Sequence, residues 1–232
     1  RDLHSFPTRR SSDLEIAVPL GLEFYIGLPP EIPDERLARV EPLSTWRGLL
    51  ALFYTPPAVT LKTLWPRSLL RRSFLGLNVE GWSRRYLEIE VPAGNGVGTA
   101  RAIARAYSAF AEGGAELGIA PATFARVTAP PPAPRANDVV LGVPSCFSLG
   151  FLRPGPSVVF GSSQRALGAP GAGGSLGFAD PDAHLGYAYV MNKLDFYLVN
   201  DPREKALRDA VYRAIARAHP GDTGRRRRVP VR

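Results

Sequence analysis

The sequence predicts an α+β fold in which an antiparallel sheet carries a packed C-terminal helix and adjoins part of a helical subdomain. Turn-forming residues separate four short apolar segments, and such short connections join antiparallel neighbours in a sheet. The four segments cover residues 146–152, 157–162, 173–180 and 183–192. After them, apolar residues recur at helical spacing in residues 201–219 and predict an amphipathic helix that packs across the sheet.

The first half of the chain, residues 15–127, is predicted to be mainly helical. Residues 33–43 suit one or two helical turns, and the apolar positions of 45–54 define one helical face. Alternating apolar and polar residues at 86–91 predict a strand between these helices and the next one. The sheet and the C-terminal helix then occupy residues 138–219.

A glycine-rich loop leads into the next predicted helix. Thr99 is a good N-cap, apolar residues of 102–110 share one face, and the glycines at 113–114 end the helix. The alternating glycines of 94–98 also resemble a phosphate-binding turn. A dinucleotide fingerprint would need its third glycine where Thr99 stands, and the Lys-Ser/Thr pair of a P-loop is absent. The preferred interpretation is a structural turn into a helix.

Composition narrows the class of protein. The chain has 232 residues, 45% of them apolar, and no run of about 18 apolar residues, so we expect no membrane span. Its net charge of +8 is concentrated at the ends of the chain, which argues against nucleic-acid binding. The one specific feature in favour of nucleic-acid binding is the run of four arginines at 225–228. A single cysteine, Cys146, excludes an internal disulfide and a cysteine-rich metal site. We expect no cofactor and no metal.

Both ends of the sequence differ from the middle. Residues 1–14 have no hydrophobic period, and "LHSFPTRRSSDL" resembles the conceptual translation of a sequencing adapter. We therefore expect residues 1–14 to be non-native, with a native polar tail as the alternative, and the natural chain to extend further upstream. A partial domain then covers 15–219, and a basic tail covers 220–232.

Several stretches together resemble one family. They are "PLGLEFYIGLP", "PAGNGVGTARAIARAYSAFA", "VLGVPSCFSLGF" and, above all, "FGSSQRALGAPGAGGSLGFADPDAHLGYAYVMNK", which is followed by a "DPR…ALRDAVY" helix. This sequence resembles the serine β-lactamase and penicillin-binding-protein superfamily, in its class C-like branch that includes serine esterases. The resemblance covers roughly residues 15–219 and implies the β-lactamase-like version of the α+β fold.

The resemblance also implies a partial active site. The family's K-T-G or H-x-G element maps onto Ala169, Pro170 and Gly171, which together with Gly173 would lie beside the substrate. Gly171 would let the backbone approach the substrate closely. The backbone N–H of Ala172 would be one donor of the oxyanion hole. The alternative is a glycine-rich β-turn without a catalytic duty.

The family's nucleophile is missing from these residues. It is the Ser of an S-x-x-K motif, and no Ser stands three residues before Lys62, Lys193 or Lys205. Among other candidates, Cys146 is expected in the core and His184 at the surface. We therefore expect a serine hydrolase that acts on esters or amides through an acyl-enzyme, of which this chain is an inactive C-terminal part. The alternative is a non-catalytic binding or scaffold module of the same fold.

The substrate is expected to be a small neutral ester rather than a β-lactam. Ala169 stands where the family usually has a Lys or His, so this position offers no cation to a substrate carboxylate. Arg165 and Lys193 are the nearest cations in sequence, and Leu167, Leu176 and Phe178 make the surroundings apolar. The sequence leaves open the oligomeric state and a cytoplasmic or periplasmic location.

Overall fold

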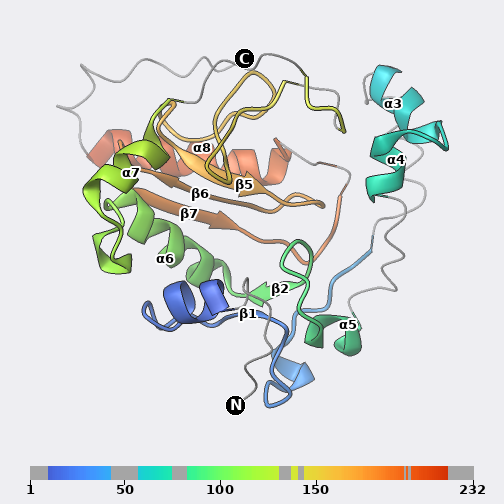
Figure 1. The fold of residues 1–232 in the computed structure, drawn as a ribbon, viewed down its shortest axis with the longest axis horizontal. Helices are drawn as coiled ribbons and strands as arrows, with labels where there is room; N and C mark the ends of the chain where they lie inside the picture. The colour runs from blue at the N-terminus through green and yellow to red at the C-terminus, as the bar shows by residue number, and fades with distance from the viewer. Residues whose placement is uncertain are drawn as a thin grey trace.

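The computed structural model describes residues 10–42, 57–74, 83–130, 137–140, 144–195, 197 and 200–218 (Figure 1). In chain order the elements are η1 (Arg10–Ala17), β1 (Phe24–Ile26), η2 (Asp34–Arg36), α3 (Pro57–Leu64), α4 (Leu69–Phe74), α5 (Arg84–Glu88), β2 (Gly96–Gly98), α6 (Ala100–Ala111), η3 (Ala115–Leu117), α7 (Pro121–Thr128), β3 (Phe147–Ser148), β4 (Phe151–Leu152), β5 (Leu167–Pro170), β6 (Leu176–Asp180), β7 (Leu185–Tyr189) and α8 (Pro202–Ala218). The helix predicted at 45–54 and the tail at 220–232 lie outside the described residues.

The main sheet runs in chain order, β3-β4-β5-β6-β7, and every neighbouring pair is antiparallel. In β5 and β6, Leu167 stands opposite Ala179 and Pro170 stands opposite Leu176. Short connections between sequential strands favour this arrangement. The predicted α+β fold with an antiparallel sheet and a C-terminal helix is confirmed.

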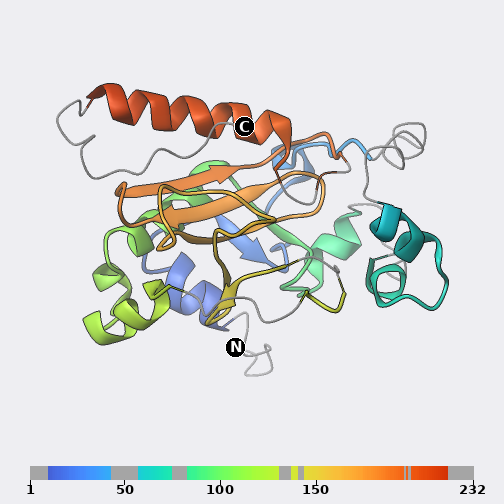
Figure 2. The same cartoon turned by 90° about the horizontal axis from the view of Figure 1, so that it is seen from above.

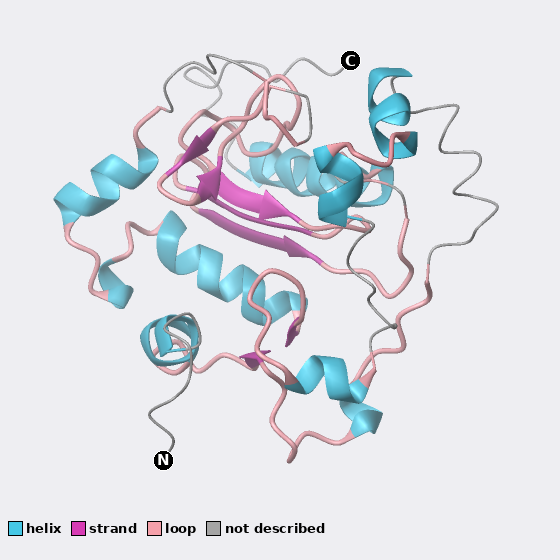
Figure 3. Ribbon diagram, turned by 45° about the vertical axis from the view of Figure 1, so that its right-hand side comes forward, coloured by secondary structure: helices cyan, strands magenta, loops and turns pink. Residues whose placement is uncertain are grey.

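Helices cover both faces of this sheet. Figure 2 shows α8 lying along one side and the segments coloured blue to green on the other, and Figure 3 shows the strands as a layer between helices. Under α8, Phe178 packs with Tyr187 and Phe160 in an aromatic cluster, and Val211 and Tyr212 of the helix pack against it. Strand β6 is buried over its whole length because both of its faces are covered.

The opposite face admits α6 only because glycines remove side chains from the sheet. A Cβ on Gly177 would lie 2.5 Å from Cε2 of Tyr107, and a Cβ on Gly186 would overlap with the backbone of Ser108. Helix α6 therefore packs directly on the backbone of β6 and β7. As predicted, Thr99 caps the helix, with its Oγ1 accepting the N–H of Ala102 at 3.0 Å.

A second, smaller sheet joins two distant segments of the first half of the chain. Strands β1 and β2 pair antiparallel, with Tyr25 opposite Val97. Glu41 forms a further bridge, to the residues that follow β7 of the main sheet. Its N–H donates to the carbonyl of Asn192 at 2.6 Å, and its carbonyl accepts the N–H of Leu194 at 3.1 Å. These contacts place residues 24–42 beside the end of the main sheet.

Three local predictions are wrong. The strand expected at 86–91 is instead the short helix α5, because Ser83 caps it and Arg84 pairs with Glu88 one turn later at 2.7 Å. The segment 146–152 forms a hairpin of two strands, since Leu149 and Gly150 adopt positive φ angles and turn the chain. Residues 157–162 form no strand; their polar groups contact α8 and the end of β6 instead.

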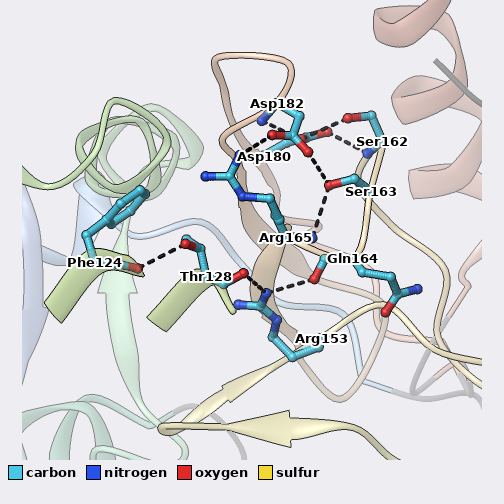
Figure 4. A network of polar contacts seen from close by, with 9 residues as sticks. All are labelled: Phe124, Thr128, Arg153, Ser162, Ser163, Gln164, Arg165, Asp180 and Asp182. Carbon is cyan, nitrogen blue, oxygen red and sulfur yellow. Dashed lines mark hydrogen bonds and ion pairs between the residues drawn. The ribbon is translucent and has the colours of Figure 1, made fainter. Parts of the chain in front are cut away.

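A buried carboxylate, Asp180, joins the loop before β5 to the end of β6 and to α8. Figure 4 shows its contact with Ser162 in that loop. Asp180 is fully buried and accepts hydrogen bonds from the N–H and hydroxyl of Ser162 at 2.5 and 3.0 Å. It also accepts the N–H of Asp182 at 3.2 Å and the Tyr212 hydroxyl at 2.6 Å. The carboxylate therefore satisfies donors from three parts of the chain.

Arg153 likewise connects separate parts of the chain, here through a buried positive charge. Its guanidinium is buried and donates to the carbonyls of Val127, Thr128 and Ala129 at the end of α7 and to the carbonyl of Gln164. Figure 4 shows the bonds to Thr128 and Gln164. A cation at a helix C-terminus is stabilised by the helix dipole. Burial, followed by the charge of Arg165, lowers the pKa of Arg153 from its ordinary value.

Replacement of Asp180 by Ala should destabilise the fold by about 2–4 kcal/mol, because several buried donors lose their acceptor at once. Urea unfolding of Asp180→Ala should show a lower midpoint at an unchanged slope. Asp182→Ala is the matched control, since Asp182 holds a more exposed pair with Arg165 and should cost less than about 1 kcal/mol. Equal losses in the two variants would contradict this role of Asp180.

Candidate functional site

The glycine-rich turn between β5 and β6 is shorter than the sequence suggested. Ala169 and Pro170, expected in the turn, lie in β5, where Ala169 stands opposite Gly177. The turn begins at Gly171, whose N–H donates to the carbonyl of Ser175 at 2.8 Å. Within it, the N–H of Gly174 donates to the carbonyl of Gly171 at 3.2 Å.

Ala172 lies at the exposed tip of this turn. Among the hydrogen bonds of the described residues, none uses its N–H. Ala172 also lines a cavity of about 750 Å³. Ala172 is thus a cavity-lining residue whose N–H is used by none of the described hydrogen bonds. Gly173, by contrast, is buried, and Ala169 is exposed without being among the residues that line the cavity.

The cavity lies between the end of the main sheet and the segments around the small sheet. Its apolar lining comes from Leu28, Leu37, Leu87, Val97, Ile103, Val190, Met191 and Leu194. Next to Ala172, the turn contributes Ser175. The bridge of Glu41 to the residues after β7 brings the segment that carries Leu28 and Leu37 to this end of the sheet.

Charged side chains line one part of the cavity, mostly in pairs. Arg84 contacts Asp34 at 3.0 Å, and Arg36 contacts Glu23 at 2.8 Å. The hydrogen bond that Arg36 donates to the Glu23 carboxylate is the main cause that raises the pKa of Arg36. Arg39 also lines the cavity and forms no ion pair with another described residue. Arg39 is thus a cation that a ligand could reach.

The structure moves several residues named from the sequence away from the cavity. Leu167 and Phe178, expected to surround the ligand, are core residues with no exposed surface. Arg165 pairs with Asp182 at 2.6 Å at the other end of β5, and Lys193 lies 3.5 Å from Glu41. Of the predicted site residues, only Ala172 lines the cavity. Gly171 and Gly173 are the residues before and after Ala172 in the turn.

The two residues weighed as alternative catalytic groups are where the sequence placed them. Cys146 is a free, buried cysteine, and the His184 side chain is 74% exposed beside Glu112. Neither lines the cavity. In the described ranges, no three His, Cys, Asp or Glu side chains gather as they would around a metal ion. No helix of the described part is long and apolar enough to cross a bilayer.

Sequence reasoning missed the contacts that hold the turn from outside. Arg203 of α8 donates to the carbonyl of Gly173 at 3.1 Å and forms an ion pair with the buried Asp201 at 2.5 Å. The N–H of Asp195 donates to the same carbonyl at 3.2 Å. The "DPR" start of the last helix was visible in the sequence, but it predicts a helix start and not a contact 30 residues earlier in the chain.

The fold is thus an antiparallel sheet with a C-terminal helix packed on one face and a glycine-rich turn between β5 and β6 beside a cavity. The family model for Beta-lactamase matches residues 10–211, and the chain belongs to that family. This membership confirms the resemblance drawn from the "GAPGAGGSLGFADP" region.

Known proteins of this family are similar over much of the chain. A penicillin-binding protein homolog from Caulobacter crescentus is 30% identical with a TM-score of 0.67, covering 89% of this chain and 52% of that one. A family VIII carboxylesterase is 32% identical with a TM-score of 0.62, covering 86% and 49%. Esterase/beta-lactamase LipL from Mycobacterium tuberculosis is 39% identical over 110 residues, 47% of this chain and 25% of LipL. The chain thus spans about half the length of these structures and a quarter of LipL.

Replacement of Gly174 by Ala should destabilise the chain by more than the cost of its positive φ angle. A Cβ at Gly174 would overlap with Oδ2 of Asp201 and lie 2.9 Å from Nη2 of Arg203. Gly150→Ala is the matched control, because its φ is also positive and a Cβ there meets nothing. The control should lose about 1–2 kcal/mol and Gly174→Ala clearly more in urea unfolding. A similar loss in both would show that the turn does not press against Asp201.

Proposed function

We propose that this chain is the C-terminal part of a β-lactamase-related serine hydrolase that cleaves esters or amides through an acyl-enzyme intermediate. The observation that carries the proposal is that Ala172, at the tip of a glycine-rich turn, lines a largely apolar cavity while none of the described hydrogen bonds uses its N–H. Membership in the Beta-lactamase family and similarity to a carboxylesterase support the same chemistry.

In this proposal the chain stabilises charge rather than attacking the substrate. The N–H of Ala172 donates to the oxygen that becomes negative in the tetrahedral intermediate. Gly171, at the entrance of the turn, keeps side-chain atoms away from the reacting carbonyl. The apolar wall of the cavity receives the acyl or alkyl group and excludes water, which strengthens the hydrogen bond to the oxyanion.

The nucleophile comes from outside these 232 residues. The sequence has no Ser-x-x-Lys, Cys146 is buried, and His184 is not among the residues that line the cavity. A chain that spans about half of its structural relatives is consistent with this division. The chain alone should therefore show no serine-dependent turnover of a chromogenic ester.

The alternative is a binding module that has lost its chemistry. The cavity and the free N–H would then hold a ligand without cleaving it. The upstream coding sequence distinguishes the two functions: a Ser-x-x-Lys motif followed by a Tyr motif supports the hydrolase, and the absence of both supports the module.

The proposed substrate is a small neutral ester. Ala169 provides no cation, and the two nearby cations, Arg165 and Lys193, already face carboxylates. Arg39 is the cation in the cavity that forms no ion pair among the described residues. A substrate carboxylate would have to reach Arg39 rather than the strand beside the turn, so anionic substrates would bind in a different orientation.

Removal of the proposed oxyanion donor gives the sharpest test. In the complete enzyme, Ala172→Pro should lower kcat by about 100- to 1000-fold on a p-nitrophenyl ester, because proline has no N–H. Ala172→Val is the control, since it alters the side chain and keeps the donor. Urea unfolding of both variants establishes that the fold persists. Equal activity of the Pro and Val variants would exclude Ala172 from the oxyanion hole.

Introduction of a cation beside the turn should change substrate preference. The wild type should have a higher kcat/KM for a p-nitrophenyl ester than for a cephalosporin, and Ala169→Lys should shift that ratio by about tenfold toward the cephalosporin through a charge-assisted hydrogen bond. Ala169→Gln controls for side-chain size. A wild type that prefers the cephalosporin would contradict the proposed substrate class, and an unchanged ratio in Ala169→Lys would contradict the mapping of this position.

A further inference from the structure

We propose that Arg203, at the start of α8, is a positioning residue for the N–H of Ala172, acting through two peptide groups of the glycine-rich turn. This inference rests on the proposed function, in which that N–H binds the oxyanion. Arg203 itself neither lines the cavity nor touches Ala172 in the described contacts.

Arg203 holds the turn through hydrogen bonds to backbone carbonyls. Its Nη2 donates to the carbonyl of Gly173 at 3.1 Å, and its Nη1 donates to the carbonyl of Lys193 at 2.8 Å. The N–H of Asp195 donates to the Gly173 carbonyl as well, at 3.2 Å. Two donors from separate elements therefore fix the direction of one carbonyl in the turn.

Two rigid peptide groups carry this constraint to Ala172. The Gly173 carbonyl belongs to the same peptide group as the N–H of Gly174, and that N–H donates to the carbonyl of Gly171 at 3.2 Å. The Gly171 carbonyl in turn belongs to the same peptide group as the N–H of Ala172. In a planar trans peptide the carbonyl and the N–H point in opposite directions. A fixed Gly173 carbonyl therefore fixes the direction of the Ala172 N–H.

Asp201 keeps the guanidinium in place. Its carboxylate is 2% exposed and accepts Nε of Arg203 at 3.0 Å and the backbone N–H of Arg203 at 2.9 Å. Burial alone would raise the pKa of Asp201, but the hydrogen bonds from Arg203 outweigh it and lower that pKa below its ordinary value. Gly174 lies directly against this carboxylate, so the ion pair and the turn form one packed unit.

A purely structural role for these residues explains only part of the geometry. A cap of α8 accounts for the bond between Asp201 and the N–H of Arg203. It does not account for a guanidinium that reaches carbonyls 30 and 10 residues earlier in the chain. In addition, a cation at the outer end of aligned hydrogen bonds polarises each of them, which makes the last N–H a better donor to an anion.

The first test uses this chain and needs no activity. Arg203→Gln removes the positive charge and the two Nη donors that bind the carbonyls of Gly173 and Lys193. The hydrogen-exchange rate of the Gly174 N–H, measured by NMR, should then rise by about tenfold as the turn loosens. Lys205→Gln is the matched control, because Lys205 pairs with Asp209 further along α8 and is not in contact with the turn. An unchanged Gly174 exchange rate in Arg203→Gln would overturn the proposal.

The second test uses the complete enzyme. Arg203→Gln should lower kcat on a p-nitrophenyl ester by about tenfold, less than the loss of a whole oxyanion donor, and leave KM within about twofold. Arg203→Lys should recover part of kcat, because it keeps a donor and the charge, and Lys205→Gln should match the wild type. Loss of kcat in Arg203→Gln with this pattern supports the positioning role.

The two tests separate the failure of this inference from failure of the proposed function. Faster Gly174 exchange with an unchanged kcat overturns the positioning role while leaving the hydrolase intact. If the wild-type enzyme shows no serine-dependent turnover although exchange responds to Arg203→Gln, the proposed function is wrong, and the positioning role in catalysis falls with it.

Discussion

Three separate parts of the chain meet at one buried carboxylate, and the position of the hairpin β5–β6 depends on it. Asp180 ends β6, yet it accepts hydrogen bonds from Ser162, before β5, and from Tyr212, in the middle of α8. A buried carboxylate is tolerated only when such donors surround it. The requirement that all of them be satisfied together specifies one arrangement of loop, strand and helix.

The same hairpin is held differently at its other end. There the chain reverses direction within a few residues, and the hydrogen bonds within the turn leave the N–H of Ala172 unused. The turn's own backbone therefore forms only some of the hydrogen bonds that hold it in place. Asp201, just before α8, and Arg203, in its first turn, supply the remaining contacts. Helix α8 therefore anchors both ends of the hairpin, the far end through Tyr212 and the turn through its first residues.

Local sequence signals predicted the elements whose determinants are local. The helix after Thr99 has its cap, its apolar face and its terminal glycines within 16 residues, and the structure contains it almost as predicted. At 86–91 two local signals conflicted: alternation favoured a strand, whereas the Ser83 cap and the Arg84–Glu88 pair favoured a helix turn. The helix formed because its hydrogen bonds are made within the segment, whereas a strand needs a partner.

The sequence by itself determined the family, the presence of an antiparallel sheet and the helix that follows it, and the position of the glycine-rich turn, because these features depend on motifs and on periodicity along the chain. Only the tertiary structure decided which residues surround that turn. It placed Leu167 and Phe178 in the core and brought Leu28 and Ile103 to the cavity beside Ala172. It also brought Arg203 to Gly173. Such contacts join segments far apart in sequence, and they arise from the packing of α6 and α8 on opposite faces of one sheet, which no local pattern encodes.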